Sequence, residues 1–262
     1  MEIQQMTFDE ISLLITHYNR SSSLERLLQA FKDQQLSFRE IIVSDDGSKK
    51  EHLDYVGQLS NLYHFRLISS DRNRGLGNNI NKGQQAVTSP FTLYVQEDFI
   101  PTDQFRERLK HGLSLMKDDS SIDLVRFYAY RKHPYLRPVS NGFYEMKFYF
   151  WRPNYWQFYI YSDHPHLRRS TFTEKFGKYA EGLHVERTEF KMSIKFLQKK
   201  GKSLIHENFR DIFIQKNTET EPGQHRKKFR KFRQSSNALI IKIARTVYRH
   251  IKFRYEYLFS GD

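Results

Sequence analysis

The stretch Tyr94-Val95-Gln96-Glu97-Asp98-Phe99 joins an apolar run, which begins at Phe91, to a pair of acids. Short apolar runs of this kind are typical of buried parallel strands, and ligand sites lie at the carboxyl ends of such strands. A carboxylate pair there can hold a hard divalent cation that keeps some coordination positions for a phosphate-bearing molecule. A strand that simply meets a solvated loop would carry the same residues. The segments around this stretch therefore decide the interpretation.

Predicted strands and helices alternate through the first half of the chain. Ile11–Ile15 is expected to be a buried strand, and Ser21-Ser22-Ser23 offer N-caps to a helix whose apolar residues recur with helical spacing up to Phe31. Further strands are expected at 40–44, 64–69, 91–96 and 122–128, and further helices at about 49–59, 77–87 and 103–116. This alternation predicts an α/β fold with a Rossmann-like, mostly parallel central sheet, flanking helices and right-handed crossovers.

The second half has a different pattern. Residues 133–170 are rich in aromatic residues and prolines and look irregular, which suits either the wall of a binding cleft or a crowded edge of the core. Phe172–Lys199 has a helical pattern, and Gly201 is expected to end that helix before a short strand at 203–205.

Length and composition predict one large domain, or one domain with an appendage, because 262 residues with 38% hydrophobic content can bury a sizeable core. The absence of cysteine excludes disulfides, thiolate metal sites and a cysteine nucleophile, and it suits a reducing cytoplasm. The polar start Met1–Gln5 has no apolar h-region, so no signal peptide is expected, and no apolar run is long enough to span a bilayer.

The net charge of +13 is concentrated near the C-terminus, where residues 226–254 hold 11 Lys and Arg residues and no acid. At 100° per residue, one helical face there carries Ile240, Ile243, Ala244, Val247 and Ile251. The opposite face carries Lys242, Arg245, Arg249 and Lys252. A basic amphipathic helix of this kind binds anionic membrane surfaces. The alternative is that its apolar face packs on the catalytic domain or on a second copy; nucleic acid is not an expected partner.

Two acidic turns end predicted strands: Asp45-Asp46 and Glu97-Asp98. The segment between them has room for two βα units, so both turns can lie at one edge of the sheet. A carboxylate at the first turn can accept a hydrogen bond from a base or ribose, and the second can hold a metal that bridges a diphosphate. Thr16 and Tyr18, after the first strand, add a polar group and a flat ring for the same ligand.

From Ile11 to His206 the chain resembles the inverting, metal-dependent glycosyltransferases of family 2, which have the GT-A fold. The resemblance rests on segments 12–20, 40–48, 73–77, 81–83, 96–98 and 182–189. Of these, Ser12-Leu13-Leu14-Ile15-Thr16-His17-Tyr18-Asn19-Arg20 and Glu40-Ile41-Ile42-Val43-Ser44-Asp45-Asp46-Gly47-Ser48 are the most specific.

The resemblance implies roles for particular residues. Thr16, Tyr18 and Asp46 match the nucleotide contacts of the family, and Asp98 matches the acid that binds Mn²⁺ or Mg²⁺, with Glu97 towards the ribose or donor sugar. The motif here is reduced to Gln-Glu-Asp. Ile80 stands where the family often has an Arg, so Arg72, Arg74 or Lys82 is expected to meet the diphosphate, with Arg74 and Lys82 assigned to the nucleotide site.

The catalytic base and the acceptor site are also inferred from the resemblance. The Glu-Asp pair that is usual in the family is Glu186-Arg187 here, so Glu186 is the expected base, followed by Glu189 and Glu181. The alternative is that these acids lie on the polar face of a helix. Trp156, Asp163 and His166 are candidate acceptor contacts by position. His206 and His225 are candidates for a further metal ligand, although that slot of the family lies closer to Gln215.

Together these features predict a metal-dependent, hexosyltransferase-type inverting glycosyltransferase of surface polysaccharide or lipopolysaccharide-type assembly. The donor is a nucleotide-sugar, and the acceptor is a glycan or a lipid-linked molecule. The expected organisation is a nucleotide-sugar-binding half (1–132), an acceptor-binding half of the same catalytic domain (133–224) and a basic amphipathic extension (225–262). The enzyme is expected in the cytoplasm, peripheral at the inner face of the cell membrane through residues 225–254, and an oligomer is possible. The alternative is a non-catalytic GT-A-fold protein that binds nucleotide or glycan and associates with a membrane or partner through its basic tail.

Overall fold

The computed structural model describes residues 5–217 and 238–260 of the chain. One mixed sheet of nine strands, in the order β3-β2-β1-β4-β9-β6-β10-β8-β7, forms the centre of the described chain. Its strands are β1 (Met6–His17), β2 (Leu36–Asp45), β3 (Arg66–Ser69), β4 (Phe91–Gln96), β6 (Leu124–Arg126), β7 (Leu136–Ser140), β8 (Phe143–Met146), β9 (His166–Arg169) and β10 (Ser203–His206). A separate pair joins β5 (Phe99–Pro101) to β11 (Phe213–Gln215).

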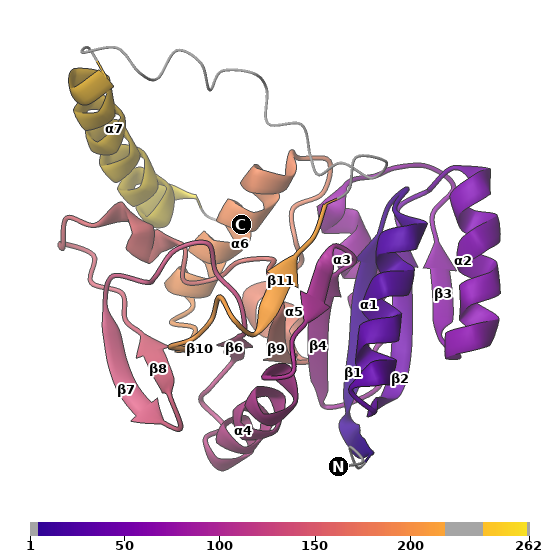
Figure 1. The fold of residues 1–262 in the computed structure, drawn as a ribbon. Helices are drawn as coiled ribbons and strands as arrows, with labels where there is room; N and C mark the ends of the chain where they lie inside the picture. The colour runs from indigo at the N-terminus through magenta and orange to yellow at the C-terminus, as the bar shows by residue number, and fades with distance from the viewer. Residues whose placement is uncertain (1–4, 218–237, 261–262) are drawn as a thin grey trace.

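The helices flank this sheet, as Figure 1 shows. They are α1 (Ser21–Asp33), α2 (Lys50–Tyr63), α3 (Leu76–Gln85), α4 (Phe105–Asp118), α5 (Phe172–Phe176), α6 (Val185–Gln198) and α7 (Ala238–Phe259), with the short 3-10 helix η1 (Tyr155–Phe158). Strands β3, β2, β1 and β4 are parallel, whereas β9 runs antiparallel between β4 and β6. The α/β fold with a mostly parallel central sheet is therefore confirmed.

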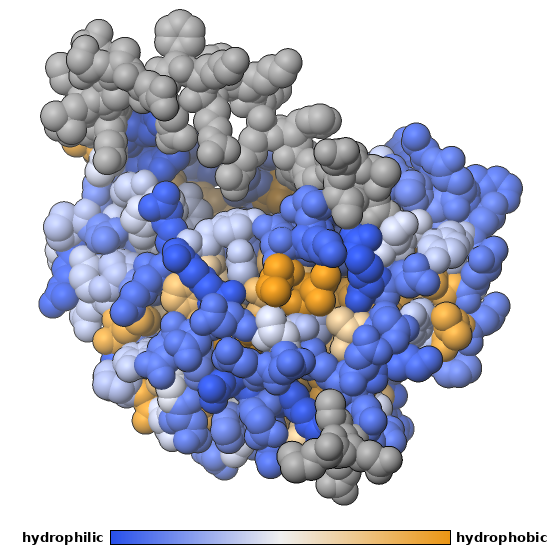
Figure 2. Space-filling model, in the orientation of Figure 1, coloured by the Kyte–Doolittle hydropathy of each residue, from blue (hydrophilic) through white to orange (hydrophobic). Residues whose placement is uncertain are grey.

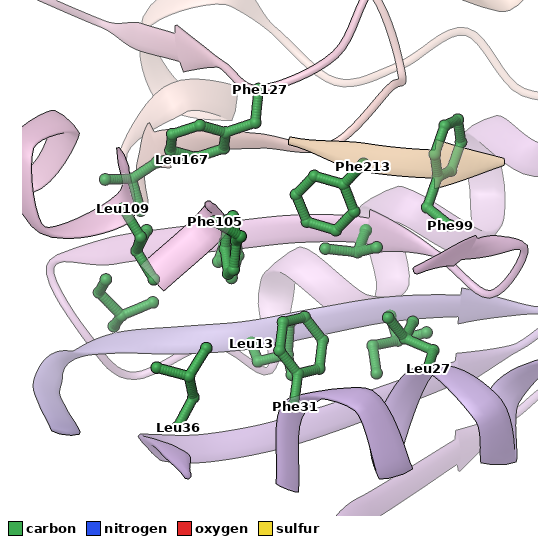
Figure 3. Packing of buried hydrophobic residues seen from close by; sticks show 14 of the residues in the cluster. Leu13, Leu27, Phe31, Leu36, Phe99, Phe105, Leu109, Phe127, Leu167 and Phe213 are labelled. Atoms are coloured by element: carbon green, nitrogen blue, oxygen red, sulfur yellow. The ribbon is translucent and has the colours of Figure 1, made fainter. Parts of the chain in front are cut away.

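The alternation of side chains along the central strands builds a core on each face of the sheet. Leu13 and Ile15 of β1 face one core, whereas Leu14 faces the other, because successive side chains of a strand point to opposite faces. The first core packs α1 and α4 against the sheet; Figure 3 shows Phe31, Phe105 and Phe213 within it. The second core packs α3, α5, α6 and the end of α7 on the opposite face.

Three local predictions are wrong. The pattern over Phe172–Lys199 is not one helix, because Gly177 and Gly182 adopt positive φ angles of 84° and 68° and separate α5 from α6. No serine side chain caps α1: Arg20 occupies the N-cap, and the hydroxyl of Ser21 instead bonds the ring of His52. Residues 133–170 are less irregular than expected, because they contain β7, β8 and β9.

Within the C-terminal extension, the predicted helix is present as α7. It lies on the side of the molecule that carries β7 and β8, next to α6 and η1 (Figure 1). Residues 218–237, which include His225 and the basic cluster Arg226–Arg233, lie outside the described residues.

Candidate active site

The two acidic turns flank the end of β1 at one edge of the sheet. His17 of β1 is in register with Asp45 of β2, and Thr16 is in register with Gln96 of β4. Asp46 and the pair Glu97-Asp98 follow these strands directly, so they leave the sheet at the same edge. This is the arrangement that the sequence predicts.

Asp45 stabilises the turn after β2. Its carboxylate accepts hydrogen bonds from the backbone N–H groups of Gly47 and Ser48, both at 3.0 Å, and pairs with His17 Nδ1 at 2.8 Å. Burial alone would raise its pKa, but the hydrogen bonds from His17 and Ser48 outweigh burial and lower the pKa of Asp45 to about 2. Asp45 is therefore ionised and structural, and it leaves Asp46 as the ligand-facing candidate of the turn.

Asp46 connects the turn after β2 to the start of α3. One carboxylate oxygen accepts the N–H of Arg74 at 2.8 Å and the other accepts the N–H of Gly75 at 2.9 Å. Burial raises the pKa of Asp46 despite these bonds. The side chain thus holds the 72–75 loop at the edge of the sheet, and its predicted nucleotide contact stays a prediction.

A polar pocket of about 350 Å³ opens beside this loop. It is lined by Ser69, Ser70, Asp71, Arg74, Asn78, Asn81, Lys82, Gln85 and Glu181. Lys82 bonds the Asp45 carbonyl and, at 2.7 Å, the Ser70 hydroxyl, and burial lowers its pKa. Glu181 accepts hydrogen bonds from Asn78 and Asn81, both at 2.8 Å. The pocket therefore brings the predicted Arg74 and Lys82 together with an acid that the sequence had offered as a base.

Thr16 and Tyr18 have different environments at the end of β1. Thr16 is buried, and its hydroxyl lies 3.0 Å from the hydroxyl of Tyr94. Tyr18 is 40% exposed at the same edge, so its ring is accessible for stacking on a base.

The Gln-Glu-Asp stretch contacts Arg20, which the sequence did not point out, and Gln215, which the resemblance placed near the slot of a further metal ligand. Arg20 Nη1 lies 3.4 Å from Glu97 and 3.3 Å from Asp98, and the amide of Gln215 donates to Asp98 Oδ2 at 2.8 Å. Gln215 thus contacts Asp98, the predicted metal ligand. His206 does not, because it packs against Phe143 and bonds Asn208. Arg20 is the last residue of the motif Thr-His-Tyr-Asn-Arg. Its place in that motif is the feature of the sequence that could have indicated a role at this site.

Asp98 suits a metal that is shared with a diphosphate. The carboxylate is buried, and its Oδ1 atom has no hydrogen-bond partner. Residues 5–217 and 238–260 contain no cluster of three or more His, Asp or Glu side chains that could bind a metal ion by itself. One carboxylate plus substrate phosphates is nevertheless a usual way to hold Mg²⁺. The Asp98 carboxylate therefore fits a cation that completes its coordination with the phosphates of a nucleotide-sugar.

The start of α6 carries the base candidates. Glu186 is exposed in the first turn. Glu189, one turn on, forms hydrogen bonds with the Ser162 hydroxyl and the Asp163 N–H. Burial and the nearby carboxylate of Asp163 raise the pKa of Glu189 to about 8, so it holds a proton at neutral pH. Arg187 points to Glu256 of α7 instead of the sheet edge. Its Nη1 atom lies 2.6 Å from Oε1 and 2.5 Å from Oε2 of Glu256.

Two of the three predicted acceptor residues are buried. His166 has no exposed surface and packs between the rings of Tyr94 and Tyr161, which gives it a structural role instead of an acceptor contact. Asp163 is 3% exposed and accepts a hydrogen bond from Tyr161 at 2.7 Å. Trp156 is partly exposed in η1, under the guanidinium of Arg131. Both Glu186 and Glu189 act electrostatically on Tyr159, so this aromatic segment lies beside the start of α6.

The family model described as glycosyl transferase family 2 matches residues 12–177, more than half of the chain. The chain belongs to this family. The matched segment contains both acidic turns and Arg20, so the edge described above lies within the family 2 domain.

Curated relatives in the family are similar over part of their length. A cholesterol galactosyltransferase of Borreliella burgdorferi is 28% identical over 121 residues, which is 46% of this chain and 33% of that protein. A poly-β-1,6-N-acetyl-D-glucosamine synthase of Staphylococcus epidermidis is 24% identical over 36% of this chain and 23% of its own length. The matches thus span a third or less of these relatives.

Solved structures share the fold. The S. aureus TarS fragment 1–349 in complex with UDP-GlcNAc has a TM-score of 0.61 at 16% identity, over 94% of this chain and 72% of that one. A mannosyltransferase of Pyrobaculum calidifontis in complex with GDP-Man and Mn²⁺ has a TM-score of 0.57 at 11% identity, over 100% of this chain and 69% of that one. The GT-A fold of the family 2 domain is thereby confirmed.

Proposed function

We propose that this family 2 protein transfers a sugar, with inversion, from a nucleotide-sugar to a hydroxyl of a glycan or lipid-linked acceptor. The observation that carries the proposal is the register of β1, β2 and β4, since it brings Asp46 and Asp98 to one edge on either side of Tyr18. A nucleoside diphosphate would extend from one acid to the other.

The donor's nucleotide would lie between Tyr18 and the polar pocket of Arg74 and Lys82. Thr16, Asp46 and Glu97 complete the proposed contacts. Both cationic side chains favour a diphosphate, and the partly exposed Tyr18 ring offers a stacking surface. The nucleotide-sugar complexes of TarS and of the Pyrobaculum mannosyltransferase support a donor of this class.

Mn²⁺ or Mg²⁺ would be held by Asp98. When bound, such a cation supplies positive charge for the departing diphosphate. Gln215 orients one oxygen of Asp98 and leaves the other without a protein partner, which supports this assignment. Arg20 lies against the same carboxylates and provides a second positive charge at the site.

Glu186 is the proposed base that takes the proton from the acceptor hydroxyl as that oxygen attacks the anomeric carbon. Glu189 is less suited, because its raised pKa keeps it protonated at neutral pH. The acceptor would lie between Glu186 and the aromatic segment around Trp156. A glycan ring stacks well on an indole, and this favours Trp156 over the buried Asp163 and His166.

We further propose that the protein works in the cytoplasm, bound peripherally at the inner face of the cell membrane. In the part of the chain that the structure describes, no helix combines the length and apolarity needed to cross a bilayer. Membrane contact would therefore come from a surface, and the basic segment 226–254 suits anionic lipid.

Nucleotide release tests the proposal. The purified full chain is incubated with Mn²⁺ and a panel of UDP-, GDP- and dTDP-sugars, with and without glycan and lipid-linked acceptors. Asp98→Asn is expected to abolish release, and Glu186→Gln to lower acceptor-dependent transfer by about 10²–10⁴-fold. Asp54→Asn, an exposed acid of α2, is the matched control. No release from any donor, or release that is indifferent to Asp98→Asn, would refute the proposal.

Arg187 favours one other candidate function. It stands where the family most often has a base, and its guanidinium is engaged with Glu256. A protein that binds nucleotide or glycan without catalysis would have these features. Calorimetric binding of a nucleoside diphosphate, without transfer to any acceptor in the panel, would support this candidate.

A further inference from the structure

Exposed hydrophobic side chains are concentrated on α7. Among residues 5–217 and 244–260, 13 large hydrophobic side chains are exposed, and six of them lie on this helix. We call them the apolar stripe: Val247, Tyr248, Ile251, Tyr255, Leu258 and Phe259. Their exposed fractions run from 51% to 67%. By contrast, the face of the molecule seen in Figure 2 is predominantly hydrophilic, with hydrophobic residues in small separate spots.

The apolar stripe points away from the protein. At 100° per residue its members fall within about one third of the helix circumference. The opposite side carries Phe253 and Glu256, which are 6% and 7% exposed. The Phe253 ring lies 4.3 Å from that of Phe190 on α6, so the buried side fixes the orientation of the helix. The helix therefore packs on the catalytic domain, as the alternative expected, but through Phe253 and not through Val247 and Ile251 of the predicted apolar face.

Basic residues border the apolar stripe along both edges. Arg245 and Lys252 lie along one edge by helical position, and Arg254 lies along the other, where it donates to the carbonyls of Phe150 and Arg152. The acid of α7, Glu256, is on the buried side and paired with Arg187. Next to Phe150 is Trp151, which is 86% exposed.

We propose that the apolar stripe is the surface that docks this protein on an anionic membrane, with α7 lying flat in the lipid interface. Charge selects this occupant over a second copy of the chain. Residues 226–254 hold 11 basic residues and no acid, so two stripes in contact would bring like charges together. Anionic headgroups neutralise the same charges, and tyrosine and tryptophan favour the membrane interface.

The docking surface is attached to the acceptor side of the candidate active site. Arg187 and Phe190 of α6 contact α7, and Arg249 of α7 bonds the Tyr155 hydroxyl at 2.9 Å in the same 3-10 helix as Trp156. Docking would therefore hold the proposed acceptor site, between Glu186 and Trp156, beside the lipid. The placement of the acceptor site beside the lipid rests on the proposed transfer to a membrane-borne acceptor. The docking itself is measured by lipid binding. The proposed transfer and the proposed docking can therefore fail independently.

Vesicle flotation of the full chain tests the docking. The probes are phosphatidylcholine vesicles with and without phosphatidylglycerol. We expect binding to the anionic vesicles, and the double variant Val247→Asp/Ile251→Asp should weaken it by about tenfold or more, because it replaces apolar side chains with charge of the same sign as the lipid. Leu62→Asp, at a 56% exposed leucine of α2, is the matched control and should bind like the parent protein.

A second measurement separates docking from misfolding and from self-association. Thermal melting should be the same for the double variant and the parent, because both substituted side chains are exposed. Light scattering gives the mass of each protein. Equal vesicle binding by parent and double variant overturns the proposal. A parent dimer that the double variant converts to a monomer, without vesicle binding by either, also overturns it and assigns the stripe to a second copy.

Discussion

Arg187 Nη1, in the first turn of α6, lies 2.6 Å from Glu256 Oε1 of α7. The residue at this position therefore joins the C-terminal helix to the helix that carries the proposed base. The contact also gives Arg187, the neighbour of the proposed base Glu186, a structural partner. Next to it, Phe253 packs on Phe190 and on Phe158 of η1. The ion pair and the aromatic cluster together hold α7 against α6 and η1.

The aromatic contact should contribute more to this attachment than the ion pair. Phe253→Ala removes a nearly buried ring and should weaken the packing of α7 on α6 and η1 by about 3 kcal/mol. Glu256→Ala should cost about 1 kcal/mol, because Arg187 is 38% exposed and solvent screens its charge. Hydrogen exchange across 244–259 measures both changes. Tyr255→Ala, on the exposed stripe, is the control and should leave exchange unchanged. A larger effect from Glu256→Ala than from Phe253→Ala would contradict this ranking.

Arg20 should compete with a divalent cation for Glu97 and Asp98. Its guanidinium lies within 3.4 Å of both carboxylates, so Arg20→Gln removes a like charge from the cation site. We expect Mn²⁺ to bind about tenfold more tightly to the variant without nucleotide. Calorimetry or Mn²⁺ magnetic resonance measures this affinity. Arg66→Gln, which removes a surface partner of Glu40, serves as the control. Unchanged or weaker Mn²⁺ binding in Arg20→Gln would place the cation elsewhere.

The raised pKa of Glu189 predicts how stability depends on pH. Between pH 4.5, the ordinary pKa of a glutamate, and about pH 8, Glu189 stays protonated in the folded protein. The stability that this group contributes is therefore fully present below 4.5 and is lost as pH rises through 8. Glutamine mimics the protonated acid, so Glu189→Gln should gain in melting temperature relative to the parent as pH rises over this range.

The control for this pH series is Glu174→Gln, which removes an exposed acid of α5. Its melting temperature should follow the parent at every pH. The melting temperatures of the parent and of Glu189→Gln are compared at each pH. If their difference stays constant from pH 4.5 to pH 8, Glu189 is ionised throughout this range. The acid would then return as a candidate base beside Glu186.

The convergence of the two acidic turns at one edge of the sheet could be predicted from sequence, because it depends on local signals. Each acidic turn directly follows an apolar strand, and parallel strands with short crossovers bring successive carboxyl ends to one edge. Asp46 and Asp98 are placed by that rule alone. The strand ends needed no knowledge of distant contacts.

Contacts between distant segments could not be predicted in the same way. Gln215 meets Asp98 across 117 residues of sequence. The resemblance placed Gln215 near the slot of a further metal ligand, but no local pattern marks its hydrogen bond to Asp98. The break between α5 and α6 depends on Gly177 and Gly182, whose positive φ angles are stabilised by tertiary context. In α7, periodicity grouped Val247 with Ile251 correctly. It could not show that Phe253, on the other side, would be the buried residue, because both sides carry apolar side chains.

Gly47 should be the least replaceable glycine at the edge that carries the two acidic turns. Its φ is +70°, and an added Cβ would lie 2.3 Å from the backbone carbonyl carbon of Arg72, in the loop that Asp46 holds. Gly47→Ala should destabilise the protein by about 2–3 kcal/mol and weaken nucleotide binding as that loop moves. Gly57→Ala is the matched control, since its Cβ would meet nothing within 4 Å on α2. Alanine there should stabilise by about 0.5–1 kcal/mol. Denaturant unfolding and nucleotide titration measure both variants, and equal stability of the two would contradict the close approach of Gly47 to Arg72.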